Sequence, residues 1–363
     1  MRTRVLLLTA CLLASVAPLL AEPALQLTRP TAIPALSWKV LPPLPDREGF
    51  AAPFAGVSGG ALLVAGGANF PDRKPWEGGA KVWYDTVFVL DRPEGSWRSA
   101  GKLPRALGYG ASVTTPDGIL CLGGSDARRH YADVFLLQWN KGILRRRKMP
   151  SLPSPCANMS VGLIGKTVYL VGGTDTPTAT AALKTFWSLD LAAKRPRWRV
   201  LEPCPGPGVM LAVSGVHEGA FYRFSGAALH GGVGGKPVRT YLREAWRYAP
   251  DTGWQRLADV PRAVVAAPSP ALVLPAHLLI VSGDDGSLAH LGPNSKHPGF
   301  SHEVLAYQWG ADRWSRFGEA PFSRATVPVV EWLGRSVIPS GEARPGVRSP
   351  EVWAVDTIRG SLP

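Results

Sequence analysis

The chain has 363 residues, of which 45% are hydrophobic, with 40 glycines, 35 prolines and a formal net charge of +13. No long stretch shows an apolar period of 3.6 residues, so the composition excludes a helical fold and predicts many short strands punctuated by turns. The positive charge would favour an anionic partner, but the sequence contains no DNA- or RNA-binding motif, and we expect no nucleic-acid partner. The densest basic run, residues 145–148, is expected to be a solvated edge strand.

Two arginines precede an apolar run over residues 5–20. This pattern predicts a signal peptide over residues 1–21, cleaved after Ala21, and therefore a periplasmic or secreted protein. Residues 8–11 also resemble a lipobox, which leaves a lipoprotein as an open alternative. No other apolar run is long enough to span a bilayer, so no integral membrane segment is expected after cleavage.

Six short apolar strands along the chain each end in a pair of small residues closed by glycine. Successive copies are 49–58 residues apart. A period near fifty, with glycine closing a strand each time, predicts an all-β, six-bladed β-propeller of kelch type, in which each repeat is one four-stranded blade. The closing glycines, expected at the ends of the second strands, are Gly67, Gly124, Gly173, Gly226, Gly283 and Gly341.

The two ends of the chain are predicted to complete one blade together. The sixth repeat stops soon after Trp353, before the outer strand that closes the other repeats. The missing strand has its counterpart around Trp38, in a segment of the same composition. We therefore expect the strand around Trp38 to pair beside the one around Trp353, which removes an open sheet edge. Residues 22–363 would form a single domain.

Three cysteines remain after the predicted cleavage. Cys121 lies in an apolar strand and is expected to be a core thiol. Cys156 and Cys204 lie in proline-rich turns of adjacent repeats, so a disulfide between them is left open. The seven histidines show no metal-ligand spacing, although three of them share the long fifth loop, and no metal site is expected.

The loops that follow the glycine pairs emerge near the axis on one side of a propeller, where they would border a central pocket. Three of them, residues 66–85, 284–303 and 340–353, are longer than folding requires, which indicates function. The glycine-rich run 231–236 lacks the Ser or Thr of a phosphate-binding loop and is interpreted as a flexible loop.

The sixth loop carries an acidic and a basic residue close together in the sequence. Glu342 and Arg348 are six residues apart, separated by a Pro345–Gly346 bend that can turn the chain back on itself. A carboxylate and a guanidinium could thus face the same pocket. The alternative is a surface ion pair that merely closes the loop.

Two motifs resemble a known family. The GEARPGVR stretch resembles the G-E-A-K-P-G-L-R signature of the bacterial N-acetylneuraminate epimerases, or sialate mutarotases, which are exported six-bladed kelch propellers. The first loop, with GGANFP followed by PWEGGAKVWYD, resembles the branch known as the cyclically permuted mutarotases. In that branch the blade order is rotated, and the resemblance implies the same here, with the epimerases' first blades corresponding to Met149 onward.

The resemblance also implies roles for individual residues. Glu342 corresponds to the catalytic proton acceptor and Arg348 to its partner arginine. A family arginine falls where Leu107 stands, and Arg105 lies two residues upstream. The further substrate-binding residues expected from this comparison are Asn69, Glu77, Lys81 and Arg105.

The implied activity is epimerisation of N-acetylneuraminate, a small-molecule sugar acid, between its α and β anomers. An arginine beside the catalytic carboxylate would bind the carboxylate of the sugar through two contacts. Such an enzyme needs no metal, nucleotide or redox cofactor. Glu77 and a histidine of the fifth loop are the candidates for the acid that protonates the ring oxygen. A non-catalytic kelch module that binds carbohydrate or protein is the alternative, whereas a copper-radical oxidase is disfavoured because Cys121 lies inside a strand.

Overall fold

The structure is a computed structural model that describes residues 35–235 and 237–358, which lie in one compact unit, Pro34–Pro363. The predicted signal peptide, its cleavage site and the lipobox lie outside the described residues, so they and the domain boundary at residue 22 remain predictions. The described residues contain strands and four short 3-10 helices but no α-helix. No helix in the described part of the chain is long and apolar enough to cross a membrane.

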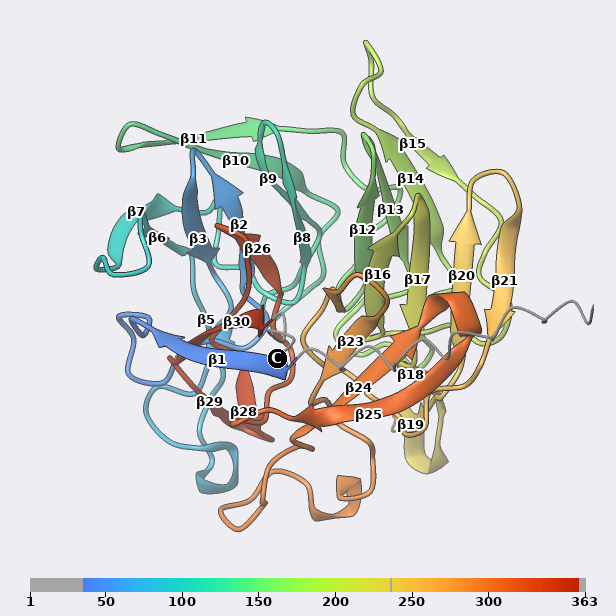
Figure 1. Cartoon of the computed structure of the whole chain (residues 1–363). Helices are drawn as coiled ribbons and strands as arrows, with labels where there is room; N and C mark the ends of the chain where they lie inside the picture. Colours follow the sequence, from blue (N-terminus) through green and yellow to red (C-terminus); the bar gives the residue numbers. More distant parts are fainter. Residues whose placement is uncertain (1–34, 236, 359–363) are drawn as a thin grey trace, which may run out of the picture. The chain divides into compact units, whose positions relative to one another are not determined.

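Six four-stranded antiparallel sheets form the blades of a β-propeller, arranged in a ring around a central axis (Figure 1). Blade 1 contains β2 (Phe54–Ser58), β3 (Ala61–Ala65), β6 (Thr86–Leu90) and β7 (Arg98–Lys102). Blade 2 contains β8 (Ala111–Thr115), β9 (Gly118–Leu122), β10 (Val134–Asn140) and β11 (Ile143–Lys148). Blade 3 contains β12 (Ser160–Ile164), β13 (Thr167–Val171), β14 (Phe186–Asp190) and β15 (Trp198–Val200).

The other three blades repeat this order along the chain. Blade 4 contains β16 (Val213–His217), β17 (Ala220–Phe224), β20 (Ala245–Ala249) and β21 (Gly253–Leu257). Blade 5 contains β22 (Leu272–Val273), β23 (Leu278–Val281), β24 (Glu303–Gln308) and β25 (Arg313–Glu319). Blade 6 contains β26 (Val330–Trp332), β27 (Arg335–Pro339), β30 (Val352–Ile358) and β1 (Ala35–Leu41).

Three two-stranded hairpins are inserted between second and third strands of blades 1, 4 and 6. They are β4–β5 (Ala68–Asn69 and Val82–Trp83), β18–β19 (Ala227–Gly231 and Pro237–Tyr241) and β28–β29 (Glu342–Arg344 and Val347–Arg348). The 3-10 helices are η1 (Pro75–Glu77), η2 (Val233–Gly235), η3 (Ala289–Leu291) and η4 (Trp309–Ala311).

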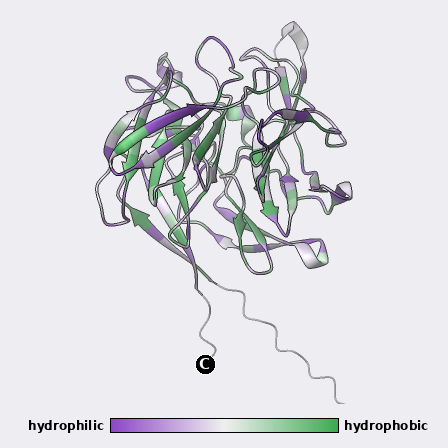
Figure 2. Ribbon diagram, turned by 90° about the horizontal axis from the view of Figure 1, so that it is seen from above, coloured by the Kyte–Doolittle hydropathy of each residue, from purple (hydrophilic) through white to green (hydrophobic). Residues whose placement is uncertain are grey.

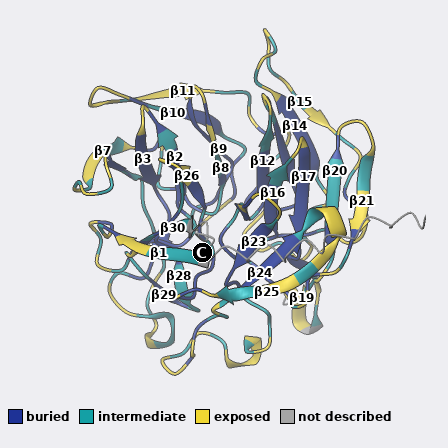
Figure 3. Ribbon diagram, in the orientation of Figure 1, coloured by how far each residue is buried: buried dark blue, intermediate teal, exposed yellow. Residues whose placement is uncertain are grey.

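The predicted fold class is confirmed. Each of the six pairs of small residues directly follows the second strand of a blade, and its closing glycine has a φ between 89° and 105°, in the region that favours glycine. The outermost strands are the most exposed and the inner strands are buried (Figure 3). The basic strand β11 is such an outermost strand, as expected for residues 145–148.

The predicted closure of the ring by both termini is also confirmed. Strand β1 pairs antiparallel with β30, so that Trp38 lies opposite Val355 and Val40 opposite Trp353. The Trp38 indole packs edge-on against Phe322, with ring centroids 5.2 Å apart. This pairing gives blade 6 its fourth strand.

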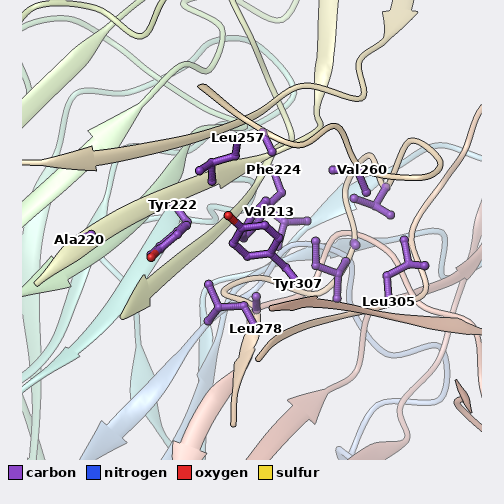
Figure 4. Close-up of a cluster of buried hydrophobic side chains, with 14 of the residues drawn as sticks. Val213, Ala220, Tyr222, Phe224, Leu257, Val260, Leu278, Leu305 and Tyr307 are labelled. Atoms are coloured by element: carbon purple, nitrogen blue, oxygen red, sulfur yellow. The ribbon is translucent and has the colours of Figure 1, made fainter. Parts of the chain in front are cut away.

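Hydrophobic side chains between neighbouring blades form the core. Apolar residues concentrate on the strands and polar residues on the connections (Figure 2). One buried cluster lies at each of the six junctions; Figure 4 shows the one between blades 4 and 5, where Phe224 and Tyr307 pack with ring centroids 5.5 Å apart. The blades therefore depend on one another for burial of their faces.

A closed ring of six backbone hydrogen bonds links the blades around the axis. In each bond, an N–H of one blade donates to a carbonyl oxygen of the preceding one, with N···O distances of 2.6–3.0 Å. All six residues have a positive φ, between 48° and 60°. They are Ala52, Tyr109, Asn158, Leu211, Ala266 and Thr326.

The three described cysteines are free and buried, so Cys156 and Cys204 do not form a disulfide in this structure. Cys121 is a core thiol, as expected. Burial raises the pKa of Cys121, raises that of Cys156 to about 12 and that of Cys204 to about 11, which keeps these thiols protonated.

Removal of β1 should destabilise the whole ring. A chain that begins at residue 42 loses the β1–β30 pairing and the packing of Trp38, so its free energy of unfolding should fall by at least about 3 kcal/mol. A chain that begins at residue 34 keeps β1 and serves as the control. Denaturant unfolding of both measures the difference, and equal midpoints would contradict this account of closure.

Candidate functional site

A cavity of about 620 Å³ opens where the loops after the second strands meet. Its floor includes the axial hydrogen-bonded residues Tyr109, Asn158, Leu211, Ala266 and Thr326. Beneath it, a space of about 90 Å³ continues between the first strands of the blades. A cavity of the upper one's size suits a small-molecule ligand.

Each blade carries one equivalent residue immediately after its closing glycine, and three of the six line the cavity. In every blade, the residue after the closing glycine forms an antiparallel bridge with the residue just before the axial ring residue. These six bridged residues are Ala68, Ser125, Thr174, Ala227, Asp284 and Glu342. Blades 5 and 6 thus supply two ionisable side chains at matching positions, and both line the cavity.

Glu342 is held by three donors. Its Oε1 accepts hydrogen bonds from Arg348 Nη1 at 3.0 Å and from the Gly346 backbone N–H at 2.8 Å, and its Oε2 accepts one from Thr326 Oγ1 at 3.3 Å. The bend expected between Glu342 and Arg348 is the β28–β29 hairpin, which pairs these two residues directly. The carboxylate is thereby oriented within the cavity wall.

Arg348 is almost completely buried. Its side chain is 3% exposed and that of Glu342 17% exposed, so this is not a surface ion pair. Arg348 Nε donates to the Ala68 carbonyl oxygen at 3.3 Å, and its guanidinium lies 4.8 Å from the centroid of the Phe70 ring. The guanidinium is therefore committed to Glu342 and to the first loop, and it ties blade 6 to blade 1.

Blade 5 places a second carboxylate beside a tyrosine. The Tyr241 hydroxyl donates to Asp284 Oδ2 at 2.9 Å, while the Gly286 N–H donates to Oδ1 at 3.0 Å. Gly286 has a φ of +81°, and a Cβ there would come within 2.7 Å of the Tyr241 ring, so glycine is required for this contact. Burial, and then Asp284, raise the pKa of Tyr241 to about 12. The hydroxyl is thus protonated at neutral pH.

Lys81 lies in an aromatic cage. Its Nζ is 5.9, 5.5 and 5.0 Å from the ring centroids of Phe70, Trp83 and Tyr109, and it donates to the Tyr109 hydroxyl at 3.2 Å. All four side chains line the cavity. The cage holds an ammonium group at the cavity wall through cation–π interactions.

Of the fifth-loop histidines, His297 lines the cavity and is 4% exposed. Its Nδ1 accepts a hydrogen bond from the Gly299 N–H at 3.1 Å, which leaves the proton of the neutral ring on Nε2. His302 instead contacts the Ala320 carbonyl oxygen, and His290 is exposed in η3. Within the described ranges no three His, Cys, Asp or Glu side chains are grouped as metal ligands would be.

The other residues expected at the site lie away from the cavity lining. Asn69 is fully buried. Its side-chain Nδ2 donates hydrogen bonds to Asp46 Oδ1 and to the Gly49 carbonyl oxygen, and its Oδ1 accepts one from the Tyr84 hydroxyl. Glu77 is exposed and accepts a hydrogen bond from the Lys74 N–H at the start of η1. Arg105 pairs with Asp133 at 3.1 Å and stacks 4.4 Å from the Tyr131 ring. Glu342, Arg348 and Lys81 thus line one cavity. Asn69, Glu77 and Arg105 do not line it.

The fourth loop also reaches the cavity, although it was not predicted to do so. The run interpreted there as a flexible loop connects the two strands of the β18–β19 hairpin, which carries Arg239 and Tyr241 to the cavity. The length of this loop could have indicated its role, because residues 227–243 form a connection between the second and third strands that is similar in length to the other long loops.

Comparison with known proteins supports the resemblance to the epimerases. The family model described as N-acetylneuraminate epimerase matches residues 30–145. The N-acetylneuraminate epimerase of Brucella suis is 43% identical over 116 residues, which cover 28% of this chain and 29% of that protein. That of Vibrio cholerae serotype O1 is 37% identical over 119 residues, covering 28% and 30%. The matched region therefore covers less than a third of the length of each of these relatives.

The similarity to N-acetylneuraminate epimerases is confirmed over this segment, which contains Lys81 but neither Glu342 nor Arg348. A rotated blade order would restrict a collinear match to one such segment. The solved structure titled "Structure of YjhT" superimposes with a TM-score of 0.63 at 16% identity, covering 86% of this chain and 95% of that one. At that identity it supports the propeller fold alone.

The buried Glu342–Arg348 ion pair is expected to contribute to the free energy of unfolding. Arg348→Met would leave Glu342 without its cation and should lower the free energy of unfolding by about 2–3 kcal/mol. Adding Glu342→Gln should recover part of this loss, because no unpaired carboxylate then remains. Denaturant unfolding of the parent, the two single variants and the double variant gives the coupling energy. A coupling near zero would mean that the two side chains act independently.

Proposed function

We propose that the protein is an isomerase that interconverts the α and β anomers of N-acetylneuraminate without a cofactor. The observation that carries the proposal is the orientation of Glu342 by Arg348, Gly346 and Thr326 at the wall of a cavity of about 620 Å³. The match of residues 30–145 to the epimerase family supports the same activity.

In the proposed reaction, Glu342 takes the proton of the anomeric hydroxyl group while the bond between the anomeric carbon and the ring oxygen breaks. The ring oxygen leaves as an alkoxide and receives the proton of the Tyr241 hydroxyl. Rotation about the adjacent carbon–carbon bond presents the other face of the carbonyl group. The protons then return to their starting oxygens as the ring closes to the other anomer. Each assisted proton transfer contributes roughly 10²–10⁴-fold.

Tyr241 suits the acid role for two reasons. Its hydroxyl remains protonated at neutral pH, with a pKa raised to about 12, yet a phenol is a stronger acid than the sugar alcohol that it protonates. Asp284, its hydrogen-bond partner, sits one blade away from Glu342 at the matching position. The acid would thus approach the substrate from blade 4 and the base from blade 6, with Asp284 of the intervening blade 5 holding the acid. Of the candidates expected from sequence, Glu77 is exposed and outside the cavity lining, whereas His297 lies within it.

Replacement of the base should abolish most turnover while sugar binding survives. Glu342→Gln keeps the shape and can still accept a hydrogen bond from Arg348, but it cannot take a proton, so the rate should fall by about 10²-fold or more. Proton NMR of freshly released α-N-acetylneuraminate follows the reaction against the uncatalysed background. Glu77→Gln, at an exposed residue outside the cavity, is the matched control. Parental rates in Glu342→Gln would reject this residue as the base. A parent that binds the sugar without accelerating equilibration would instead indicate the binding-module alternative.

The acid assignment has its own test. Tyr241→Phe removes only the hydroxyl group and should lower the rate constant of anomer exchange by about 10²-fold, with little change in sugar affinity. Tyr248→Phe, in the cluster between blades 3 and 4, is the control for loss of a tyrosine hydroxyl. If Tyr241→Phe retains the parental rate and His297→Gln does not, the acid is His297.

We also propose that the protein acts in the periplasm or outside the cell. The support is the sequence pattern at residues 1–21. Mass spectrometry of protein recovered from the producing cell should give a mature N-terminus near Glu22. An intact Met1 would contradict export by cleavage, and a lipid on Cys11 would identify a lipoprotein.

A further inference from the structure

Lys81 stands out in the cavity because no carboxylate accompanies it. Among the described residues, no Asp or Glu oxygen lies within 4.0 Å of its Nζ, which contacts only the Tyr109 hydroxyl and three aromatic rings. The side chain is partly buried. A cation in such surroundings has lost water without gaining an anion, which favours binding of an anionic ligand.

The carboxylates of the cavity are differently placed, since each already accepts hydrogen bonds from the protein. Glu342 accepts from Arg348, Asp284 from Tyr241, and Asp126 from Tyr131 and two backbone N–H groups. These acids need no cation from a ligand. Lys81 is therefore the partly buried cation of the cavity that has neither an acid nor several hydrogen bonds to hold it, whereas Arg239, which also lines the cavity without an ion pair among the described residues, is exposed to water.

Phe70 contacts both this positive charge and the Glu342–Arg348 ion pair. The Lys81 ammonium and the Arg348 guanidinium both lie within 6 Å of the centroid of its ring. The indole Nε1 of Trp83, in the same cage, is buried and has no acceptor within the described ranges. An anion bound at Lys81 would thus share the Phe70 ring with the Glu342–Arg348 pair without touching Glu342, and it would lie next to a second donor, Trp83 Nε1.

We propose that Lys81 binds the carboxylate of the substrate and makes the enzyme selective for sugar acids. This inference rests on the proposed function and assigns to Lys81 the contact that the sequence comparison suggested for Arg348. A substrate carboxylate on the Arg348 guanidinium would lie against the Glu342 carboxylate and repel it. Binding at Lys81 separates the two negative charges and leaves Arg348 to orient the base. The aromatic rings exclude water from the contact, which strengthens the attraction.

The test compares ligands that differ in one charge. Affinities of N-acetylneuraminate and its methyl ester are measured by titration for the parent, Lys81→Met and Lys81→Arg. The parent should prefer the acid at least tenfold. Lys81→Met should lose most of this preference through weaker binding of the acid alone, whereas Lys81→Arg should keep most of it. In the isomerase assay, Lys81→Met should raise KM at least tenfold and change kcat less than threefold.

Lys102→Met is the matched control, because it removes an exposed lysine that pairs with Asp85 outside the cavity. It should leave the preference for the acid unchanged. Parental preference in Lys81→Met, or equal affinity of the parent for acid and ester, would overturn the assignment. Loss of preference in Glu342→Gln/Arg348→Met but not in Lys81→Met would place the carboxylate at Arg348. These binding measurements do not depend on turnover. If the parent protein fails to isomerise the sugar, the proposed function is rejected, but the titrations still decide whether Lys81 binds the carboxylate.

Discussion

The ring of six backbone hydrogen bonds around the axis is the constraint on which the rest of the structure depends. Each bond joins two blades, so the ring sets the spacing of all six first strands at once. Five of its residues are not glycine, asparagine or aspartate, yet all hold a left-handed backbone. That conformation is unfavourable for such residues by roughly 1–2 kcal/mol each, so it persists only because the surrounding blades impose it. Packing between the blades supplies that force.

The site follows from this ring by a fixed step along the chain. The residue before each ring residue bridges to the residue after a closing glycine, and three of these six equivalent positions, Ser125, Asp284 and Glu342, line the cavity. The scaffold is repeated, and its chemistry comes from what stands at each position. Thr326 belongs to both systems, because its backbone closes the ring while its hydroxyl donates to Glu342. The position of Glu342 is therefore tied directly to the residues around the axis of the fold.

Features governed by local backbone geometry could be predicted from the sequence. The glycine that closes each second strand is needed for its positive φ, and this requirement repeats visibly along the chain. Glu342 and Arg348 were predictable for a similar reason, since a bend with Gly346 at a φ of +83° returns the chain within six residues. The pairing of the terminal strands followed from a count of strands per repeat.

Features that depend on distant segments could not be predicted in this way. Asn69 belongs to the loop pattern, but its amide is satisfied by Asp46 from the segment after β1, which turns it away from the cavity. The cage around Lys81 needs rings from Phe70, Trp83 and Tyr109, the last of which comes from the next blade. The β18–β19 hairpin was missed because its glycines indicate flexibility when pairing partners are unknown.

The candidate site lies where the ring closes. Glu342 and Arg348 belong to blade 6, which both termini complete, and Lys81 belongs to blade 1. The segment after β1 reaches the site loop directly, because Phe50 accepts a hydrogen bond from the Gly341 N–H at 2.9 Å and donates one to Ser340 Oγ at 2.7 Å. Both contacts lie immediately before Glu342. A shift of blade 6 relative to blade 1 would therefore displace Glu342 relative to Lys81, so the spacing of these two side chains depends on the junction that closes the ring.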